Sequence, residues 1–468
     1  MSAADDDFNE IYDAEFGPDV IALTKIKDAE QIHSGQIRMA HRLALAYSHE
    51  LMFVHGLGWY TFDSTRWVED ERGAAQRAVY EVLRSALTES FDTKDKDLRR
   101  AVLRCESAAG VRGILDVAAA LPPFAHTVPD LDPDPYVLNT ANGTLDLRTG
   151  ELRDHDPADR ITKITNGSYR HESAGDLWPS FIERILPDAE VREFVRRLAG
   201  VGLLGTVVEQ VLAIFTGVGA NGKSVIVGAL DHALGDYAAI AEPDLFMHRE
   251  GAHPTGEMDL RGVRWVVVSE SDEGRKLATA TVKRLTGGDL IKARRMRQDF
   301  VTFKPSHLPV LITNHLPAVH GDDPALWRRL RVVPFGVVIP PAERDQHLGE
   351  KLQLEADAIV TWAAAGYFDY VQRGQLDEPE SVLVATDSYR RDSDAIRRFT
   401  DECCLFGAGW YMTTDQAYQR WSVWAAADGA EDLSRKTFGQ ALDRLGYPAD
   451  PNRRRRRYGI GLQAEEAE

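Results

Sequence analysis

The sequence predicts an α/β protein with an α+β domain before the central domain and a small basic unit after it. Between residues 208 and 340, apolar strands alternate with helices and glycine-rich loops, a pattern typical of an α/β sheet. Helical and hairpin patterns come before that region, and an arginine-rich segment lies near the end of the chain. A length of 468 residues agrees with about three domains of roughly 150 residues each.

The composition describes an acidic globular chain. Lysine and arginine number 55 and the acids 73, so the formal net charge is −18, which excludes a protein that coats polyanions by bulk charge. Any contact with nucleic acid must therefore be local. Hydrophobic residues at 44% and aromatic residues at 9% argue against disorder as the main state.

The cysteines, the acidic N-terminal segment and the length of the apolar runs indicate the cellular compartment of the protein. The three cysteines, Cys105, Cys403 and Cys404, supply neither a disulfide framework nor a four-ligand zinc site. The segment from Asp5 to Glu15 is acidic where a targeting peptide would be basic, and we expect it to pack loosely. No apolar run is long enough to span a bilayer. We therefore expect a cytoplasmic protein without a membrane partner.

Residues 1–172 are expected to form the α+β domain. Helices are expected where apolar residues recur at helical spacing, and strands where short alternating runs flank turn residues. The expected helices lie at Ile37 to Met52, 72–90 and 96–120; the expected strand pairs lie at Gly58 to Asp70, about a turn at Asp63-Ser64, and at Val137 to His155, about turns at Asn142-Gly143 and Thr149-Gly150.

The remaining boundaries follow from changes in pattern. Helical periodicity returns from Trp178 to Leu204 and again over about 346–372, and a polar, proline-containing stretch follows the second of these helices. We expect a helical collar at 173–205, the α/β core at 206–372, a linker at 373–392 and a separate unit at 393–468.

The strongest motif lies between an apolar strand and a helix. Val211 to Phe215 runs into the pattern G-x-x-x-x-G-K-S, which is the context that a phosphate-binding loop requires. Glycines allow the backbone to wrap around phosphate oxygens, and the helix N-terminus presents free N–H groups. We expect Lys223 to reach the β- and γ-phosphates of ATP and Ser224 to bind Mg²⁺; the expected phosphate-binding residues are Gly217, Gly219, Asn221, Gly222, Lys223 and Ser224.

A second apolar strand, Val263 to Val268, ends on Ser269 and Glu270. Acids at this position hold Mg²⁺ and polarise the attacking water in such nucleotide hydrolases. Glu270 is the candidate for both roles, with Asp272 as a substitute metal ligand. The alternative interpretation is a solvated acidic loop.

A third strand and a pair of arginines complete the candidate site. Leu308 to Asn314 ends on an amide that is placed to sense the γ-phosphate, although asparagine also commonly ends strands as a turn residue. Arg328 and Arg329 precede another apolar strand, and an arginine brought to a neighbouring subunit's γ-phosphate would stabilise transition-state charge. The alternative is a surface pair of arginines.

Lysine and arginine residues are concentrated in two segments, of which the first lies within the α/β core. Lys283 to Arg297 holds six bases against Asp289, a local charge of +5 in an acidic chain, and it includes a hairpin pattern with a turn near Arg295 to Asp299. A solvated charged face is one interpretation, and a local contact with DNA phosphates is the other. The candidate DNA-binding residues here are Lys283, Lys292, Arg294, Arg295 and Arg297.

The C-terminal unit has the pattern of a winged helix-turn-helix. Two helices are followed by a third, with Ser434 as its N-cap, and then by a basic wing with apolar residues after it. We expect the aromatics Trp410, Tyr418, Trp421 and Trp424 to form its core rather than a base-stacking surface. The expected DNA contacts are Arg435, Lys436, Arg453, Arg454, Arg455, Arg456 and Arg457, and a flexible arginine tail is the alternative.

No primase site stands out ahead of the α/β core. The D-x-D candidates at Asp130, Asp132 and Asp134 lie in the proline-punctuated turn PDLDPDP rather than at a strand end. We therefore expect no built-in primase, and a separate primase or polymerase partner stays open.

Taken in order, the motifs GVGANGKS, WVVVSE, the basic hairpin, the strand ending in Thr313-Asn314 and WRRLRVVPF resemble superfamily 3 helicases, and more closely the helicase part of phage and plasmid primase-helicases. GWYTFDSTRWVED and NGTLDLRTGEL are similar to the small domain that precedes the helicase in that family. The resemblance implies an AAA+-like P-loop NTPase core, a C-terminal winged helix and a ring, expected to be a hexamer. It also implies that the basic hairpin grips single-stranded DNA in the central pore.

These observations lead to one hypothesis and two rivals. The hypothesis is an ATP-dependent DNA helicase for phage or mobile-element replication, located in the bacterial cytoplasm if phage-encoded, which acts on single-stranded and forked DNA. Each ATP with Mg²⁺ would be bound by Lys223, Ser224 and Glu270, Asn314 would act as the sensor, and Arg328 or Arg329 would come from the next subunit; the resemblance implies 3′ to 5′ movement. The rivals are an ATP-switched replication initiator or loader without unwinding activity, and a small-molecule P-loop kinase.

Overall fold

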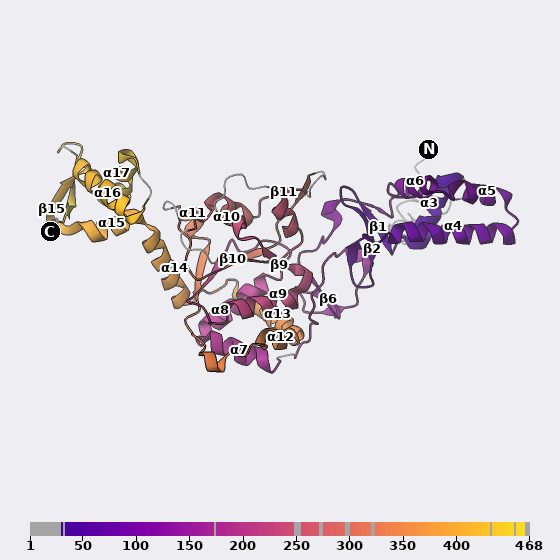
Figure 1. Cartoon of the computed structure of the whole chain (residues 1–468), viewed down its shortest axis with the longest axis horizontal. Helices are drawn as coiled ribbons and strands as arrows, with labels where there is room; N and C mark the ends of the chain where they lie inside the picture. Colours follow the sequence, from indigo (N-terminus) through magenta and orange to yellow (C-terminus); the bar gives the residue numbers. More distant parts are fainter. Residues whose placement is uncertain are drawn as a thin grey trace, which may run out of the picture.

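The computed structural model describes residues 30, 33–172, 175–247, 254–270, 275–294, 300–319, 323–430, 433–453 and 455–463. Within these ranges the chain forms an N-terminal α+β unit, a central five-stranded parallel sheet with helices on both faces, and a small C-terminal unit (Figure 1). The predicted α/β class is confirmed. The segment Asp5 to Glu15 lies outside the described residues.

In the described residues, the N-terminal unit is a four-stranded sheet packed against the helices α3 to α6. The strand order is β3-β2-β1-β4, in which the first three strands are antiparallel and β4 runs parallel to β1. The helices and one face of the sheet bury a shared apolar cluster, which includes Leu43, Leu51 and Val79. The elements are α3 (Gly35–Tyr47), β1 (Leu51–Val54), β2 (Gly58–Phe62), β3 (Trp67–Glu69), α4 (Ala74–Asp92), α5 (Lys96–Cys105), α6 (Ala108–Ala118) and β4 (Ala125–His126).

Two predicted helices differ in their bounds. The pattern from Ile37 to Met52 is a helix only to Tyr47, and its last residues belong to β1. The region 96–120 is two helices, because Ser107 accepts a hydrogen bond from the Gly110 N–H and begins α6 as its N-cap. The strand pair about Asp63-Ser64 is confirmed as β2 and β3.

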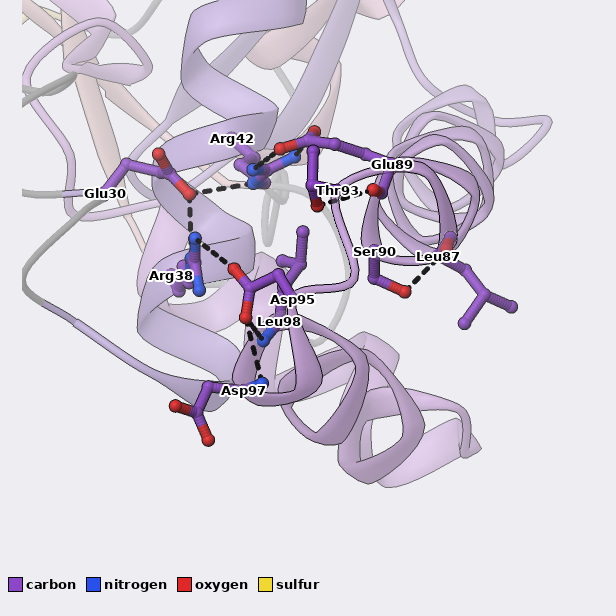
Figure 2. A network of polar contacts seen from close by, with 10 residues as sticks. All are labelled: Glu30, Arg38, Arg42, Leu87, Glu89, Ser90, Thr93, Asp95, Asp97 and Leu98. Carbon is purple, nitrogen blue, oxygen red and sulfur yellow. Dashed lines mark hydrogen bonds and ion pairs between the residues drawn. The ribbon is translucent and has the colours of Figure 1, made fainter.

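An ion-pair network ties Glu30 to α3 and α4. Figure 2 shows the Glu30 carboxylate accepting from both Arg38 and Arg42, each at 2.8 Å. Arg42 also reaches the Glu89 carboxylate on α4, and Arg38 lies 4.0 Å from Asp95. Burial alone would raise the pKa of Glu30, but the two arginines outweigh it, so the pKa lies below its ordinary value. The network therefore fixes the chain before α3 against α3 and α4.

A three-stranded sheet joins the N-terminal unit to the central one. Its strands β5 (Val137–Thr140), β6 (Gly143–Asp146) and β7 (Leu152–Arg153) are antiparallel, as the two predicted hairpins require. Leu138 and Leu145 are buried in the same hydrophobic cluster as the central helices. Part of the region 1–172 thus contributes to the central core.

The central sheet is parallel throughout. Its order is β14-β8-β13-β10-β9, so that β8, which comes first in the chain among these five strands, lies between β14 and β13. In such a sheet the carboxyl ends of all strands meet at one edge. The strands are β8 (Leu212–Thr216), β9 (Ala238–Ala241), β10 (Trp265–Glu270), β13 (Leu308–Thr313) and β14 (Leu330–Pro334).

Alternating side chains of this sheet enter two hydrophobic clusters. Ala213 and Phe215 face a cluster with the helices α7, α8, α9, α12 and α13, whereas Leu212 and Ile214 face one with α10, α11 and a two-stranded hairpin. The first face carries α7 (Leu177–Ile185), α8 (Ala189–Val201), α9 (Lys223–Leu234), α12 (Leu348–Gln353) and α13 (Ala356–Arg373); the second carries α10 (Thr279–Leu285), β11 (Ile291–Ala293), β12 (Val301–Phe303) and α11 (Pro324–Trp327). Short 3₁₀ segments lie at Val128–Asp130, Pro157–Asp159, Gly235–Tyr237, Pro243–Leu245, Pro254–Leu260 and Pro341–Glu343.

The stretch 373–392, predicted as a linker, contains a helix. This helix, α14 (Glu380–Ser393), buries Val382 and Tyr389 against the central unit. The Tyr389 hydroxyl donates to the Pro317 carbonyl, and the Thr386 hydroxyl accepts from the Val332 N–H at 2.9 Å. In Figure 1, α14 leads from the central unit to the C-terminal one. The predicted linker thus contains a helix in its second half, and this helix packs against the central unit.

The C-terminal unit has the order helix, strand, helix, helix, strand. Its elements are α15 (Ala395–Cys403), β15 (Cys404–Thr413), α16 (Thr414–Asp428), α17 (Arg435–Arg444) and β16 (Arg456–Leu462). Ser434 accepts from the Thr437 N–H and begins α17, as predicted. The ten-residue strand β15 was not predicted, and it pairs antiparallel with β16. Across the ranges that the structure describes, no helix is both long and apolar enough to cross a membrane.

Candidate functional site

The glycine-rich loop lies where β8 gives way to α9, at the carboxyl edge of the central sheet. Gly222, which precedes α9, has φ 84°, and a Cβ there would come within 2.5 Å of Ile185. A Cβ on Gly217 would come within 2.4 Å of both the Asn221 amide and the Phe335 carbonyl. The tight path of the loop therefore requires glycine at both positions.

Asn221 braces this loop from within. Its side chain is buried, and its Nδ2 donates to the Phe335 carbonyl at 3.1 Å, in the segment that follows β14. Its Oδ1 accepts from the Lys223 Nζ at 3.2 Å. The Ile339 N–H donates to the Ala220 carbonyl at 2.9 Å. The sequence motif placed Asn221 at the phosphates, and the structure shows that its amide holds the loop against the segment after β14.

Lys223 is the most unusual charged residue of the site. Its side chain is buried, with 4% of the residue exposed, and its ammonium donates to the Gly217 carbonyl at 2.6 Å. The other acceptors are Asn221 Oδ1 and Asn314 Oδ1, each at 3.2 Å. Within the described residues, all of these acceptors are neutral oxygens, and burial lowers the pKa of Lys223. The position favours an anionic ligand that would neutralise the charge.

The three predicted strand ends converge at one edge. Glu270 is paired in register with Thr313, and Thr313 is paired with Thr216, so the ends of β10, β13 and β8 lie side by side. Asn314, directly after β13, is joined to Lys223 by the 3.2 Å hydrogen bond. Ser224 is exposed in the first turn of α9.

Part of the acidic prediction falls on residues that the structure does not describe. The backbone of Glu270 ends β10 at the converging edge, but its side chain lies outside the described part of the chain. Asp272 lies outside it entirely. A serine hydroxyl and a carboxylate are hard oxygen ligands of the kind that Mg²⁺ prefers, so Ser224 and Glu270 suit that ion in chemical type.

The two candidate finger arginines have opposite environments. Arg329 is buried, and its guanidinium donates to the Ala325 carbonyl and to Gln210 Oε1 at 2.8 Å. Arg328, the residue directly before it, is exposed. Arg329 therefore braces α11 and the start of β8 within its own chain, so its contacts do not favour it over Arg328 as the finger. Arg328, whose side chain is exposed, stays the candidate for a contact with a neighbouring chain.

The basic segment 283–297 divides into two parts. On α10, Lys283 forms an ion pair with Asp323 at 2.8 Å, and this pair lowers the pKa of Asp323. The predicted hairpin is confirmed, because β11 and β12 pair antiparallel. On this hairpin, Lys292 and Arg294 lie over the ring of Phe300, at 5.2 and 4.7 Å from its centroid. Arg295 and Arg297 fall outside the described residues.

Phe300 is a candidate functional residue that the sequence analysis missed. Its ring is 49% exposed although it is flanked by two cations. An exposed aromatic ring between lysine and arginine is a common arrangement in grooves that bind single-stranded nucleic acid. The sequence does contain a signal for this residue: Phe300 directly follows the arginine-rich turn and precedes the alternating residues of β12.

The arginine run near the C-terminus also divides. Arg457 is buried, and its guanidinium donates to Thr414 Oγ1 at 3.1 Å, to Asp443 at 2.6 Å, to the Gly439 carbonyl at 2.9 Å and to the Tyr447 carbonyl. It is thus a structural residue of this unit, and the prediction that it contacts DNA is wrong. Arg453 and Arg455 are exposed in the turn before β16, Arg456 is half-buried on β16, and Arg454 lies outside the described residues.

At the N-terminus of α17, Arg435 and Lys436 are exposed, as a DNA contact requires. Arg435 is ion-paired with Asp415 of α16.

Of the predicted aromatic core, Trp421 is fully buried and Tyr418 and Trp424 pack against its cluster, whereas Trp410 is 47% exposed. The core prediction is therefore wrong for Trp410.

The aspartates of the PDLDPDP turn have structural partners. Asp130 accepts from the Thr127 N–H and hydroxyl, Asp132 binds Thr162, and Asp134 forms an ion pair with Arg148 at 2.6 Å. Among the residues that the structure describes, no group of three or more His, Cys, Asp or Glu side chains could hold a metal ion. The prediction that this segment is a turn is confirmed.

The chain matches two family models. Residues 40–187 match the family described as "D5 N terminal like", and residues 215–329 match a "Family of unknown function (DUF5906)". The first match spans the N-terminal unit through α7, and the second runs from the end of β8 to the arginine pair. The two matches thus cover most of the N-terminal region and the motifs from the glycine-rich loop to the arginine pair, whereas the C-terminal unit lies outside both.

Curated relatives extend these matches. A candidate helicase of Acanthamoeba polyphaga mimivirus is 27% identical over 426 residues, covering 81% of this chain and 44% of the relative. A candidate helicase of Frog virus 3 is 24% identical over 450 residues, covering 77% of this chain and 46% of the relative. A candidate primase of African swine fever virus is 24% identical over 211 residues, covering 43% and 22%. The chain spans less than half the length of these relatives.

Among solved structures, an apo form of the NrS-1 C-terminal region is similar to this chain with a TM-score of 0.45 and 12% sequence identity, covering 75% of each chain.

Proposed function

We propose that this chain, which is similar in sequence to candidate helicases of large viruses, is an ATP-dependent DNA helicase that assembles as a ring and moves along single-stranded DNA. The observation that carries the proposal is the buried Lys223 ammonium, which is surrounded by neutral oxygens at the converging strand ends. The glycine-rich loop and the N-terminus of α9 would bind the β- and γ-phosphates of ATP, and Lys223 would neutralise their charge.

The proposed roles of the other residues follow from their places. Ser224 and Glu270 would bind Mg²⁺, and Glu270 would polarise the attacking water from the end of β10. Asn314 would exchange its hydrogen bond with Lys223 for one with the γ-phosphate, which makes it a sensor of hydrolysis. Arg328 of the adjacent subunit would stabilise transition-state charge.

The hairpin and the C-terminal unit supply the proposed DNA contacts. Lys292 and Arg294 would bind phosphates of one strand in a ring pore, and the helix-strand-helix-helix-strand order supports a winged helix that binds duplex or forked DNA through α17. We propose a hexamer, 3′ to 5′ movement and a role in replicating a phage, virus or other mobile element. A separate primase or polymerase is the proposed partner.

The test compares Lys223→Ala with wild type. With ATP and Mg²⁺, wild type should hydrolyse ATP faster when single-stranded DNA is added and should unwind a forked duplex, whereas Lys223→Ala should lose at least about a hundredfold in both rates. Lys351→Ala is the matched control, because Lys351 is an exposed lysine of α12, paired with Asp345.

Three outcomes would contradict the proposal in different ways. Equal unwinding by Lys223→Ala and wild type would exclude the nucleotide site. DNA-stimulated hydrolysis without unwinding would favour the ATP-switched loader. Hydrolysis that requires a small acceptor molecule and ignores DNA would favour a kinase.

A further inference from the structure

The sheet of the C-terminal unit carries exposed aromatic rings on its outer face. Trp410, Tyr411 and Tyr458 are 47%, 51% and 40% exposed, respectively. The interior of the unit is filled without them, since Phe399, Trp421 and Phe438 pack against one another and are fully buried. Large rings that a unit leaves outside a completed core mark a binding surface more often than a packing defect.

The two tyrosines form one continuous patch across the strands. Tyr411 of β15 is paired in register with Tyr458 of β16, and their ring centroids are 6.3 Å apart. Neighbouring residues on a strand point to opposite faces, so Met412 and Arg457 turn inward and are buried while the tyrosines turn outward. The buried side chains of Met412 and Arg457 therefore fix the outward orientation of the two tyrosines.

An irregularity in the sheet adds the tryptophan to this patch. The register between β15 and β16 shifts between Phe406 and Tyr411, so residues 407–410 bulge from the ladder. The Trp410 side chain lies over Gly461 of β16, where a Cβ would approach its ring to 3.0 Å. Glycine at 461 therefore leaves room for the indole on the sheet.

Arginines surround the same rings. The guanidinium of Arg456 lies over the Tyr411 ring, 4.4 Å from its centroid, and Arg453 lies 3.5 Å from the Tyr458 hydroxyl. Arg455 is exposed in the turn between them in sequence. A stacking surface edged with guanidinium groups is complementary to a strand whose bases are unpaired and whose phosphates are negative.

We propose that this face, made of Trp410, Tyr411, Tyr458, Arg453, Arg455 and Arg456, binds single-stranded DNA by stacking unpaired bases on its rings. The inference rests on the proposed action on DNA and deepens it. It gives the C-terminal unit a second contact, separate from the Arg435 end of α17, that recognises melted rather than duplex DNA. The rings would supply base-dependent affinity, and the arginines would supply affinity that depends on phosphates.

The test uses the full chain and two strands of about 20 nucleotides, oligo-dT and an abasic strand with the same backbone charge. The double change Tyr411→Ala with Tyr458→Ala should weaken binding of oligo-dT by at least about tenfold and leave binding of the abasic strand unchanged. Tyr411→Phe with Tyr458→Phe keeps the rings and should bind as wild type does. Tyr80→Ala, an exposed tyrosine of α4 in the N-terminal unit, is the matched control.

The arginines and the position of the contact are tested separately. Arg455→Gln should weaken both strands by a similar factor. Irradiation of a 5-iodouracil-substituted strand bound to wild type should give adducts in peptides that contain Tyr411 or Tyr458. An equal loss on both strands, no loss in the alanine pair, or adducts confined to other peptides would overturn the proposal.

Unwinding of a forked duplex is measured in parallel, so that a failure of the stacking face can be distinguished from a failure of the helicase proposal. If wild type unwinds a fork but the alanine pair shows no selective loss on oligo-dT, the stacking face is wrong and the helicase proposal stands. If wild type binds with the predicted selectivity but does not unwind, the stacking face stands and the helicase proposal fails. If wild type binds neither strand, both are wrong.

Discussion

At the scale of single residues, adjacent side chains at the end of α11 have opposite environments. Arg328 is exposed, whereas Arg329 is buried against Gln210. The sequence shows two consecutive arginines before an apolar strand and contains no signal that separates them. The choice depends on how the turn between α11 and β14 packs against Gln210, and only the tertiary structure determines that.

We expect Arg328→Ala to lower the rate of ATP hydrolysis by about a thousandfold or more while nucleotide binding is kept, because the finger would act only on transition-state charge. Arg329→Ala should instead lower the thermal midpoint, because it removes a buried brace. The measurements are steady-state hydrolysis, nucleotide affinity and thermal unfolding of each variant.

Mixing provides the sharper control. Chains with Lys223→Ala and chains with Arg328→Ala, each inactive alone, should regain part of the activity when mixed, since some interfaces would combine an intact loop with an intact finger. Full activity of Arg328→Ala alone, or no recovery when the two inactive chains are mixed, would contradict a finger that acts between subunits.

At the same scale, His307 is expected to affect the stability of the fold rather than activity. His307, just before β13, is buried, and neither ring nitrogen has a hydrogen-bond partner within the described structure. Burial lowers the pKa of His307 from 6.5 to about 4. The unfolded chain therefore takes up a proton near pH 6.5 that the folded chain refuses until about pH 4, so stability should fall as the pH drops through this window.

We expect wild type to lose about 2 kcal/mol between pH 7.5 and pH 5 through His307 alone, from the difference between its folded and unfolded pKa. His307→Leu removes the titrating group and two unsatisfied nitrogens, so it should keep its stability better over the same interval. Denaturation at the two pH values measures the difference. An identical loss in both proteins would show that His307 does not control this response.

At the scale of elements, the basic segment shows what charge counting can and cannot tell. The sequence predicts the hairpin correctly, because β11 and β12 alternate apolar residues about a polar turn. It does not predict that Lys283 belongs to α10 and is paired with Asp323, which lies about forty residues further along the chain. Only a tertiary contact separates the paired lysine from Lys292 and Arg294.

We expect Lys292→Gln with Arg294→Gln to flatten the salt dependence of single-strand affinity. Each phosphate contact contributes roughly −0.7 to the slope of log affinity against log salt, so the pair should reduce its magnitude by about 1.4. Fluorescence anisotropy with labelled oligo-dT at several salt concentrations measures it.

Lys283→Gln is the matched control, since its ammonium is already engaged by Asp323 and its loss should change the slope little. A wild-type affinity that does not depend on salt would exclude a phosphate-binding hairpin altogether.

Two elements escaped the sequence analysis for physical reasons. In β15, the segment Gly407-Ala408-Gly409 bulges out of the ladder and breaks the alternation that marks a strand. In α14, the described side chains include only two that are fully buried, Val382 and Tyr389, so its apolar face is too narrow to stand out in a polar, proline-flanked stretch. Both elements are specified by contacts distant in sequence.

At the scale of the whole molecule, the candidate site is assembled by the strand order. The loop at 217–222, Glu270 and Asn314 are far apart in the chain, and they meet because β13 lies between β8 and β10. The sequence predicts each strand and the polar residue at its end, and the rule that parallel strands share a carboxyl edge predicts their meeting. It does not predict that Leu138 and Leu145, from the preceding region, complete the central core, because this requires the packing of separate units.

The contact between α14 and the sheet has a consequence for the solubility of the chain. β14 is an edge strand, and an edge strand with free N–H groups is a template on which another chain can add a strand. Along the outward side of β14, the Val332 N–H is taken by the Thr386 hydroxyl, and the next outward position is Pro334, which has no N–H to donate. A copy of the chain that met this edge would find no donor at either position. The helix that connects the last unit to the sheet therefore also protects that sheet against edge-to-edge aggregation.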